Sequence, residues 1–580
     1  MSTGEFERVH LGISIIIFVT ATALMPWSSA DAGAASKVPE RAMHGMVVSA
    51  HYLASQVGVD VLKRGGNAVD AAIATGFALA VTYPAAGNIG GGGFMLVRLA
   101  DGTTTSFDFR EKSPAAAHER MYLDSNGVYI SDLNHEGYLA VGVPGTVAGF
   151  FSAHEKFGKT PMKELIEPAI ELTEDGFAVT WALHDDLKEL DSLLRVYPAT
   201  AQAFLKNGKT VYEPGENLQQ PDLGRTFRRI QRHGRDGFYR GETARLIAAD
   251  MKKHGGLITE ADLAAYQARE RPPVHGTYRD YEILSMGPPS SGGVAVIEML
   301  NILEGFDLAE AGHNSAQHIH LMSEAMRRAY ADRARYLGDP DFNPEMPVDQ
   351  LISKEHASRL RRSINLNRAS HSDPTAFAEP YESTQTTHYS VVDHDGNVVV
   401  VTYTLENSYG SRIVAEGTGF LLNNEMGDFN PWPGQTDSTG MIGTSPNLLA
   451  PGKRMLSSMT PTIVLYEGRP FLLIGSPGGR TIPNTVLQTI LNVVDFKMDV
   501  AEAISAPRMH HQWLPDRISI EKFGTTKDSQ RLLEMMGHHV QVVESSRWMG
   551  SVTAIMIDTL TNMRLGSADP RERDGAAIGY

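Results

Sequence analysis

The hydroxyl of one threonine stands where it could act as a nucleophile. Thr386 opens the segment Thr386-Thr387-His388-Tyr389-Ser390, which is typical of the start of a buried strand, deep inside a chain of 580 residues. An internal threonine is a weak nucleophile, but a threonine at a new chain terminus carries its own base, an α-amino group with a pKa of about 7.7 to 8.0. Cleavage of the bond between Gln385 and Thr386 would therefore create an N-terminal nucleophile.

A second hydroxyl is expected beside the first. Asp395-Gly396 is a hairpin turn signal, and the apolar run after it ends at Thr404. A two-residue loop places Thr387 opposite Thr404, whereas a three-residue loop ending in a left-handed Gly396 places Thr386 opposite Thr404. In either register the Thr404 hydroxyl could orient or polarise the nucleophile. Two ordinary strand threonines explain the same spacing equally well.

A pair of glycines could stabilise negative charge. Gly478 and Gly479 lie in Gly475-Ser476-Pro477-Gly478-Gly479-Arg480, after an expected strand and before an expected helix. Consecutive glycines at a helix N-terminal approach leave backbone N–H groups unobstructed, which is the geometry that holds a developing oxyanion. Turns use glycine for steric reasons just as often, so this motif by itself is a weak signal.

Other polar residues could bind a ligand that carries both a carboxylate and an ammonium group. Ser457 and Ser458 could donate two hydroxyls to a carboxylate, and Arg110 could supply the positive charge. The segment 423–429 contains carboxylates suited to an ammonium group. A serine-bearing turn and a solvated acidic turn are the plainer explanations of these two segments.

The expected secondary structure indicates how these residues meet. Apolar periodicity and end signals predict helices near 51–64, 68–81, 145–157, 162–175, 223–232, 294–303, 315–336 and 484–494, and strands near 46–50, 94–97, 104–110, 386–392, 398–404, 459–465, 471–475, 540 and 552–557. A first part rich in helices and a later part rich in strands predict helices outside two packed sheets.

Two small-residue motifs are assigned to structure. The four glycines 90–93 lack the GK[ST] signature of a phosphate loop, which favours close backbone packing. Ser290 and Ser291 open a helix without the G-x-S-x-G pattern of a nucleophile elbow, which favours N-capping.

Composition excludes several classes of protein. The formal net charge is −16, and no clustered basic face is evident, which argues against nucleic-acid binding. Cysteine is absent, so disulfides, thiolate metal sites and cysteine nucleophiles are excluded. No long linker divides the chain, so we expect one large α/β body that acts on a small polar substrate.

The first 32 residues are typical of an export signal. An apolar run from Leu11 to Met25 is followed by Ala30-Asp31-Ala32, a small-x-small cleavage site. Its n-region is poor, because Glu5 and Glu7 outweigh Arg8, and an uncleaved membrane anchor is the alternative. With about 15 mostly apolar residues, the run is short for a bilayer span of roughly 20. We expect a periplasmic or secreted protein without a stable membrane span after signal removal.

Together these motifs resemble the γ-glutamyltranspeptidase family over essentially the whole mature chain. The matching segments are 386–393, Leu422-Asn423-Asn424-Glu425, Leu456-Ser457-Ser458-Met459, 475–479 and 506–513, with Gly90 to Gly93, 109–111, 569–571 and 579–580. Several long, ordered motifs make chance similarity implausible.

The resemblance implies an α+β fold, the four-layer αββα sandwich of the N-terminal nucleophile hydrolases, made as one precursor. Residues 1–32 would be the signal peptide, 33–385 the large subunit and 386–580 the small subunit, and both subunits would remain in one integrated fold as a heterodimer. The implied activity is that of a γ-glutamyltransferase and hydrolase, which takes the γ-glutamyl group of glutathione or related compounds and passes it to water, amino acids or peptides, without a cofactor.

The resemblance also implies residue roles. Thr386 would be the nucleophile, with Thr404 beside it, and the Gly478 and Gly479 amides would hold the oxyanion. Arg110, Ser457 and Ser458 would bind the α-carboxylate of the glutamyl group, and Glu406, Glu425 and Asp428 its α-ammonium group. The sequence departs from the family pattern at Glu406, where many relatives have asparagine, at Met455, which replaces a proline, and in the lid-like stretch 432–451, which contains no tyrosine.

Three alternatives remain open at this stage. A glutaryl-cephalosporin-type acylase would share the fold but bind a substrate without an ammonium group; retention of three carboxylates argues against it, because burying them without a cation is costly. A catalytically silent binding protein on the same scaffold is a second alternative. A metal enzyme is the third, suggested by His318-x-His320 and His510-His511, but such histidines diverge, and we expect no catalytic metal.

Overall fold

The computed structural model describes the chain except residues 2–36, 374–385, 436, 439–440, 442 and 545–548. Apart from Met1, the expected signal segment therefore lies outside the described residues, and so does Gln385.

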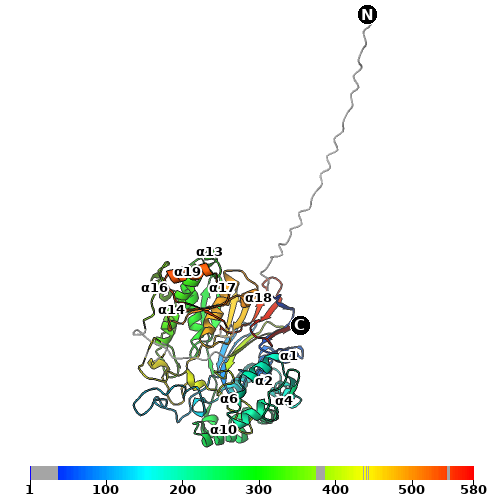
Figure 1. Ribbon diagram of the computed structural model, residues 1–580. Coiled ribbons are helices and arrows are strands. Elements are labelled where there is room, and N and C mark those ends of the chain that lie inside the picture. The colour runs from blue at the N-terminus through cyan, green and yellow to red at the C-terminus, as the bar shows by residue number, and fades with distance from the viewer. Residues whose placement is uncertain (2–36, 374–385, 436, 439–440, 442, 545–548) are drawn as a thin grey trace.

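Two seven-stranded antiparallel sheets form the centre of the molecule (Figure 1). The first has the order β1 (Glu40–Ala42), β18 (Arg564–Ala568), β17 (Thr553–Ile557), β13 (Arg469–Gly475), β12 (Thr462–Tyr466), β9 (Tyr281–Ser285), β8 (Val274–Tyr278). The second has the order β19 (Ala576–Gly579), β2 (Met46–Ser49), β10 (Thr387–Val392), β11 (Val398–Thr404), β3 (Gly92–Arg98), β4 (Thr104–Asp108), β7 (Arg269–Arg271).

The sheets pack face to face because their strands are apolar on both sides. Along β11, Val398 and Val400 join the cluster between the sheets, whereas Val399 and Val401 join the cluster under the helices of the second sheet. The interior between the sheets is completed by aliphatic side chains of β12, β13 and β17, including Ile463, Leu473 and Ile555. A strand buried on both faces needs this continuous apolar pattern.

Helices cover both outer faces. The second sheet is covered by α1 (Tyr52–Lys63), α2 (Ala68–Thr82) and α3 (Thr146–Phe157), with α4 (Met162–Glu174) and α8 (Pro221–His233) outside them. The first sheet is covered by α12 (Gly292–Leu303), α17 (Thr481–Val494) and α18 (Val500–Ser505), with α14 (Ala316–Tyr336), α16 (Lys354–Arg362) and α19 (Lys527–Met535) further out. Figure 1 shows α14, α16 and α19 at the upper left of the molecule and α2 and α4 at the lower right. The predicted αββα sandwich is confirmed.

The structure contains further helices and strands. They are η1 (Tyr138–Ala140), β5 (Phe177–Ala178), α5 (Trp181–Glu189), α6 (Asp191–Leu194), α7 (Pro198–Phe204), β6 (Asn217–Leu218), α9 (Asp236–Tyr239), α10 (Gly241–His254), α11 (Glu260–Ala265), α13 (Leu308–Ala311), α15 (Val348–Leu351), η2 (Glu425–Asp428), η3 (Ser445–Asn447), β14 (Met509–His510), β15 (Ile518–Glu521) and β16 (Val540–Val543). Among the described residues, no helix has the length and apolar character needed to cross a bilayer.

The capping role predicted for Ser290 and Ser291 holds for one of them. The Ser290 hydroxyl oxygen accepts from the N–H of Gly292, the first residue of α12, at 3.2 Å, whereas Ser291, at the N-cap position, makes no cap hydrogen bond. Its hydroxyl donates instead to the Ser457 carbonyl oxygen at 2.7 Å, and the Ser290 hydroxyl donates to the Met459 carbonyl oxygen at 2.5 Å. The two serines therefore hold the segment that carries Ser457 and Ser458.

Candidate active site

One small pocket brings together most of the predicted site residues. Its cavity volume is about 20 Å³, and it is lined by Arg110, Thr386, Thr404, Glu406, Glu425, Asp428, Ser457, Ser458, Met459, Gly479 and Ile482. Thr404 ends β11, Glu425 and Asp428 belong to η2, and Ile482 belongs to α17, while the other lining residues lie in loops, so residues far apart in sequence meet only in the folded chain. Gly478 directly precedes the lining residue Gly479 in the sequence but does not itself line the pocket.

The two threonines lie side by side at the end of the β10–β11 hairpin. Thr387 pairs with Tyr403, so the register brings Thr386 opposite Thr404, and Gly396 in the turn has a φ of 90°. This confirms the three-residue loop of the two predicted registers. The Thr386 hydroxyl donates to Thr404 Oγ1 at 3.4 Å, and Thr404 Oγ1 also accepts from the backbone N–H of Glu406 at 2.9 Å. Thr404 is thus fixed by the main chain where it contacts the candidate nucleophile.

The glycine run before β3 allows this arrangement. A Cβ atom on Gly91 would lie 2.0 Å from the Thr404 carbonyl oxygen, a distance that no side chain tolerates. The same carbonyl accepts a hydrogen bond from Asn88 Nδ2 at 2.9 Å, and Asn88 Oδ1 accepts from the Gly91 N–H at 2.9 Å. Close backbone packing, predicted for residues 90–93, is confirmed, and it positions Thr404.

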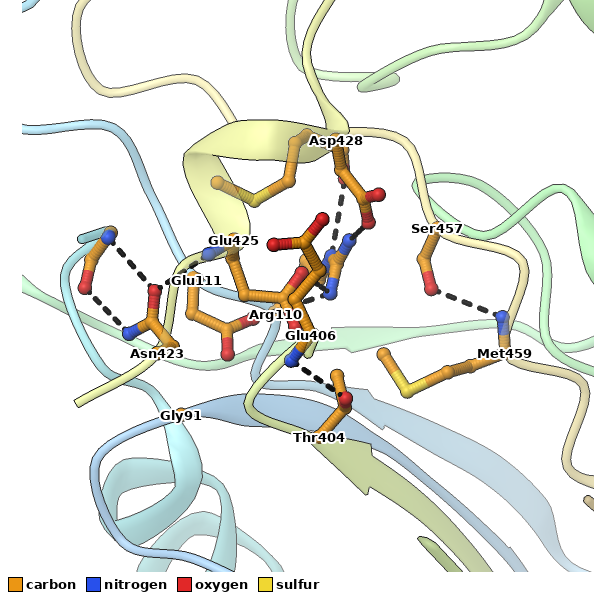
Figure 2. Close-up of polar contacts among 12 residues, drawn as sticks. Gly91, Arg110, Glu111, Thr404, Glu406, Asn423, Glu425, Asp428, Ser457 and Met459 are labelled. Carbon is orange, nitrogen blue, oxygen red and sulfur yellow. Dashed lines mark hydrogen bonds and ion pairs between the residues drawn. The ribbon is translucent and has the colours of Figure 1, made fainter. Parts of the chain in front are cut away.

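Arg110 is the centre of a buried charged cluster (Figure 2). It is 1% exposed, and its Nη1 lies 2.5 Å from Glu425 Oε2 while its Nη2 pairs with Asp428. Glu111 Oε2 is 3.5 Å from Nη1. The backbone N–H of Arg110 donates to Asp108 Oδ1 at 3.0 Å, which anchors the end of β4. The residues expected to bind opposite ends of a zwitterion therefore pair with each other in this structure.

The cluster holds more carboxylates than its cations can neutralise. Burial raises the pKa of Glu425 well above its usual value and that of Glu111 to about 8, although Arg110 acts in the opposite direction on both. Burial also raises the pKa of Glu406 to about 7, opposed first by His135. A buried carboxylate without a full counter-charge is costly, so this end of the pocket favours a cationic group.

Ser457 and Ser458 face the same pocket from the segment before β12. Ser457 Oγ accepts from the Met459 N–H at 3.1 Å, as Figure 2 shows, and its hydroxyl proton remains available to an acceptor. Arg333 of α14 is 4% exposed and donates through Nη2 to Ser458 Oγ at 3.2 Å. Arg333 is a second buried cation behind the serines, and no sequence motif identified it.

The glycine pair turns the chain from β13 into α17. Gly478 has a φ of 127° and Gly479 a φ of 54°, both in the range that favours glycine. The Gly478 carbonyl oxygen accepts from the Thr481 N–H at 3.0 Å and from its hydroxyl at 2.8 Å. These bonds fix the direction of the loop, and the oxyanion role of the two amides stays a prediction.

Besides Arg333, two residues of the site, Glu111 and His135, were given no role in the sequence analysis. Glu111 directly follows Arg110, which is a signal that could have found it. His135 belongs to a loop without any motif, and its Nδ1 lies 3.0 Å from Glu406 Oε1. Only tertiary contact identifies this second residue.

The histidines suggested as metal ligands have other partners. His318 Nδ1 accepts from the Asn314 N–H at 3.0 Å, and His510 Nδ1 lies 2.7 Å from Asn484 Nδ2. The pair His318-x-His320 does not converge: His320 instead lies near Glu324 and His538. That group is already neutralised, because Glu324 is paired with Arg328 at 2.7 Å.

A second group that could hold a cation comprises Glu298, Asp332 and His356. Arg359 Nη2 lies 3.0 Å from His356 Nδ1, and because arginine only donates, the proton of His356 is on Nε2, which donates to Asp332 Oδ2 at 2.7 Å. The nitrogen that faces the carboxylates therefore has no lone pair for a metal. Neither group lines the pocket.

Comparison with known proteins decides the family. The γ-glutamyltranspeptidase family model matches residues 54–580. The chain belongs to the γ-glutamyltranspeptidase family. It is 48% identical over 546 residues to the glutathione hydrolase proenzyme of Escherichia coli K12, which covers 93% of each chain.

Solved structures agree with the sequence match. The crystal structure of a cephalosporin acylase from Bacillus halodurans aligns with a TM-score of 0.83 at 27% identity, covering 96% of this chain and 99% of that one. A γ-glutamyltranspeptidase from Pseudomonas nitroreducens aligns with a TM-score of 0.52 at 40% identity, covering 58% of this chain and 96% of that one. The acylase likeness confirms the fold, and the higher identity is to the transpeptidase.

Proposed function

We propose that this chain is a self-processing γ-glutamyltransferase and hydrolase that cleaves the γ-glutamyl amide bond of glutathione and related compounds. One observation carries the proposal: Thr386 lines the same small pocket as Arg110 and the carboxylates Glu406, Glu425 and Asp428. A candidate nucleophile and groups of both charges thus share one pocket. The name of the Escherichia coli relative, glutathione hydrolase proenzyme, supports both the donor and the processing.

Processing would use the same hydroxyl as turnover. The Thr386 oxygen attacks the Gln385 carbonyl carbon, the amide nitrogen leaves as the Thr386 amine, and the resulting ester is hydrolysed by water. The products are a large subunit, 33–385 after signal removal, and a small subunit, 386–580. The subunits would stay together as a heterodimer, because β10 and β11 of the small subunit pair with β2 and β3 of the large one.

In the mature enzyme, Thr386 attacks the γ-amide carbonyl and its own amino group accepts the hydroxyl proton. The Gly478 and Gly479 amides hold the tetrahedral oxyanion, a contribution of roughly 3 to 4 kcal/mol per donor in comparable sites. Thr404 orients the nucleophile. The amino group returns the proton to the leaving amine, and the acyl-enzyme passes to water or to an amino acid or peptide.

The proposed specificity for γ-glutamyl groups follows from an exchange of ion-pair partners in the pocket. Arg110 is paired with Glu425 and Asp428 in this structure, so a ligand must offer each of them a new partner. A glutamyl group does so, because its α-carboxylate binds Arg110, Ser457 and Ser458 while its α-ammonium binds Glu406, Glu425 and Asp428. A glutaryl group has no ammonium and would leave buried carboxylates unpaired. This argument favours a transpeptidase over a glutaryl acylase.

The location follows from the expected signal. Removal of residues 1–32 would leave a periplasmic or secreted enzyme with access to extracellular γ-glutamyl compounds.

Two measurements test the proposal. Mass spectrometry of purified protein should find a fragment beginning at Thr386. Hydrolysis of γ-glutamyl-p-nitroanilide should exceed hydrolysis of glutaryl-p-nitroanilide by at least about 100-fold, since removing a buried charged partner costs roughly 3 kcal/mol. An uncleaved 63.2 kDa chain without amidase activity would identify a silent binding protein, and faster glutaryl cleavage would identify an acylase.

A further inference from the structure

His135 contacts the ammonium end of the pocket from outside. Its Nδ1 lies 3.0 Å from Glu406 Oε1, and the two side chains are 8% and 3% exposed. His135 does not line the pocket, whereas Glu406 does. The histidine therefore stands behind a proposed substrate-binding carboxylate and is shielded from solvent with it.

Both partners are held in place by the loops around them. The His135 carbonyl oxygen accepts from Asn424 Nδ2 at 3.1 Å, and a Cβ atom on Gly427 would lie 2.3 Å from the imidazole Nδ1. The ring is therefore packed against the backbone of η2, which carries Glu425 and Asp428. Glu406 has a φ of 78°, a strained value for a residue other than glycine. Such strain persists only where the surroundings fix the residue, and it is common at ligand sites.

We propose that His135 is a positioning residue: it holds the Glu406 carboxylate toward the substrate ammonium group and sets how much negative charge that carboxylate presents. The inference rests on the proposed function and adds a residue to it. It stands on the contact with Glu406 and on the packing against Gly427, because both fix the imidazole in one place.

The charge at this contact changes near neutral pH. Burial lowers the pKa of His135, but Glu406 more than offsets this effect and the pKa is raised; burial raises the pKa of Glu406 to about 7, with His135 opposing. Fully protonated, the pair carries one positive charge, which repels an ammonium group. Fully deprotonated, it carries one negative charge, which attracts it. The groups that act on the pair from other elements are Asp428, Glu425, Asp132, Arg110, Tyr122 and Tyr129.

Replacing His135 by a neutral residue should weaken donor binding in a pH-dependent way. Without a cationic partner, the buried Glu406 carboxylate keeps its proton to higher pH. For His135→Gln, which retains a hydrogen-bond donor, we expect the acid limb of kcat/KM for γ-glutamyl-p-nitroanilide to move up by about one pH unit. The KM at pH 7 should rise about tenfold, equivalent to about 1.4 kcal/mol, with kcat within about twofold of the parent.

A double-mutant cycle separates this role from a structural one. Glu406→Gln removes the group through which His135 acts, so His135→Gln in that background should leave the KM unchanged. His118→Gln changes an exposed histidine of the same polypeptide region and should leave the pH profile unchanged. Additive effects of the two site substitutions, or a His135→Gln profile that overlays that of the parent, would overturn the proposal.

A measurement that does not depend on enzyme activity separates the test of His135 from the test of the proposed function. Imidazole proton NMR of the parent protein, with the His135 signal assigned by its loss in His135→Gln, should show titration above pH 6.5 that moves down in Glu406→Gln. Added L-glutamate should shift this signal, and glutarate should not. If the enzyme fails to hydrolyse γ-glutamyl-p-nitroanilide, the proposed function fails. If the titration of the His135 signal is the same in Glu406→Gln, or if L-glutamate and glutarate shift the signal equally, the role proposed for His135 is refuted.

Discussion

The pocket has two halves that are built in different ways. Around Thr386 and Thr404 the groups are neutral, and sheet register and main-chain hydrogen bonds fix them. Around Arg110 the groups are charged, come from η2 and the loops, and hold one another through ion pairs. The first half is preorganised by the fold, whereas the second can exchange its internal partners for those of a ligand. We infer that the first half provides the chemistry and the second half the selectivity.

The largest effect should come from the nucleophile. Thr386→Ala should abolish both chain cleavage and amidase activity, lowering kcat by about 10⁴-fold or more, because one oxygen serves both reactions. Gel electrophoresis and γ-glutamyl-p-nitroanilide hydrolysis measure the two outcomes. Thr387→Val is the matched control, since among the described residues the Thr387 hydroxyl has no hydrogen-bond partner. Cleavage or activity in Thr386→Ala would refute the assignment of the nucleophile.

The two halves were predictable to different degrees. The apolar runs in 387–392 and 398–404 and the turn at Gly396 predict the hairpin, and the hairpin register by itself brings Thr386 beside Thr404. Residue types suggested Arg110 for a carboxylate and the carboxylates of 423–429 for an ammonium group, but only the family resemblance assigned these roles, because no local pattern brings β4 to η2. Neither the local sequence patterns nor the family resemblance identified His135 and Arg333, because their contacts depend on how segments distant in sequence pack. Residues defined by a periodic pattern are accessible to sequence reasoning, whereas those defined by the meeting of irregular segments are not.

Loss of Arg110 should weaken binding of the γ-glutamyl donor and leave chain cleavage by Thr386 intact. Arg110→Gln leaves Glu425 and Asp428 without their cation, and the KM for the γ-glutamyl anilide should rise about 100-fold, equivalent to about 3 kcal/mol for an uncompensated buried pair. Chain cleavage should persist, because the internal Gln385 bond carries no free α-carboxylate for Arg110 to bind. Arg120→Gln, an exposed site, serves as the control. Equal losses of cleavage and turnover would show that the halves are not separable.

Thr404 tests how far the neutral half depends on a single hydrogen bond. Thr404→Val keeps the shape but removes the acceptor of the Glu406 N–H and of the Thr386 hydroxyl. We expect kcat to fall about 5- to 30-fold, equivalent to about 1 to 2 kcal/mol, with the KM changed less than twofold. Thr404→Ser restores the hydroxyl and should recover most of the rate. A change confined to KM would place Thr404 in the charged half instead.

The smallest effect is a stability difference that the charged half alone should show. Burial raises the pKa of Glu111 to about 8, far above its value in the unfolded chain. The native state therefore binds more protons than the unfolded state between about pH 4.5 and 8, and this group's contribution to stability falls as pH rises through that window. Glu111→Gln removes the titration, so its Tm relative to the parent should be about 1 to 2 °C higher at pH 8.5 than at pH 6. Differential scanning calorimetry measures this difference, with Glu119→Gln, an exposed carboxylate on the same segment, as the control. If Glu111→Gln shifts the Tm equally at both pH values, the pKa of Glu111 is not raised above this range, and the shortage of counter-charge assigned to this half is absent.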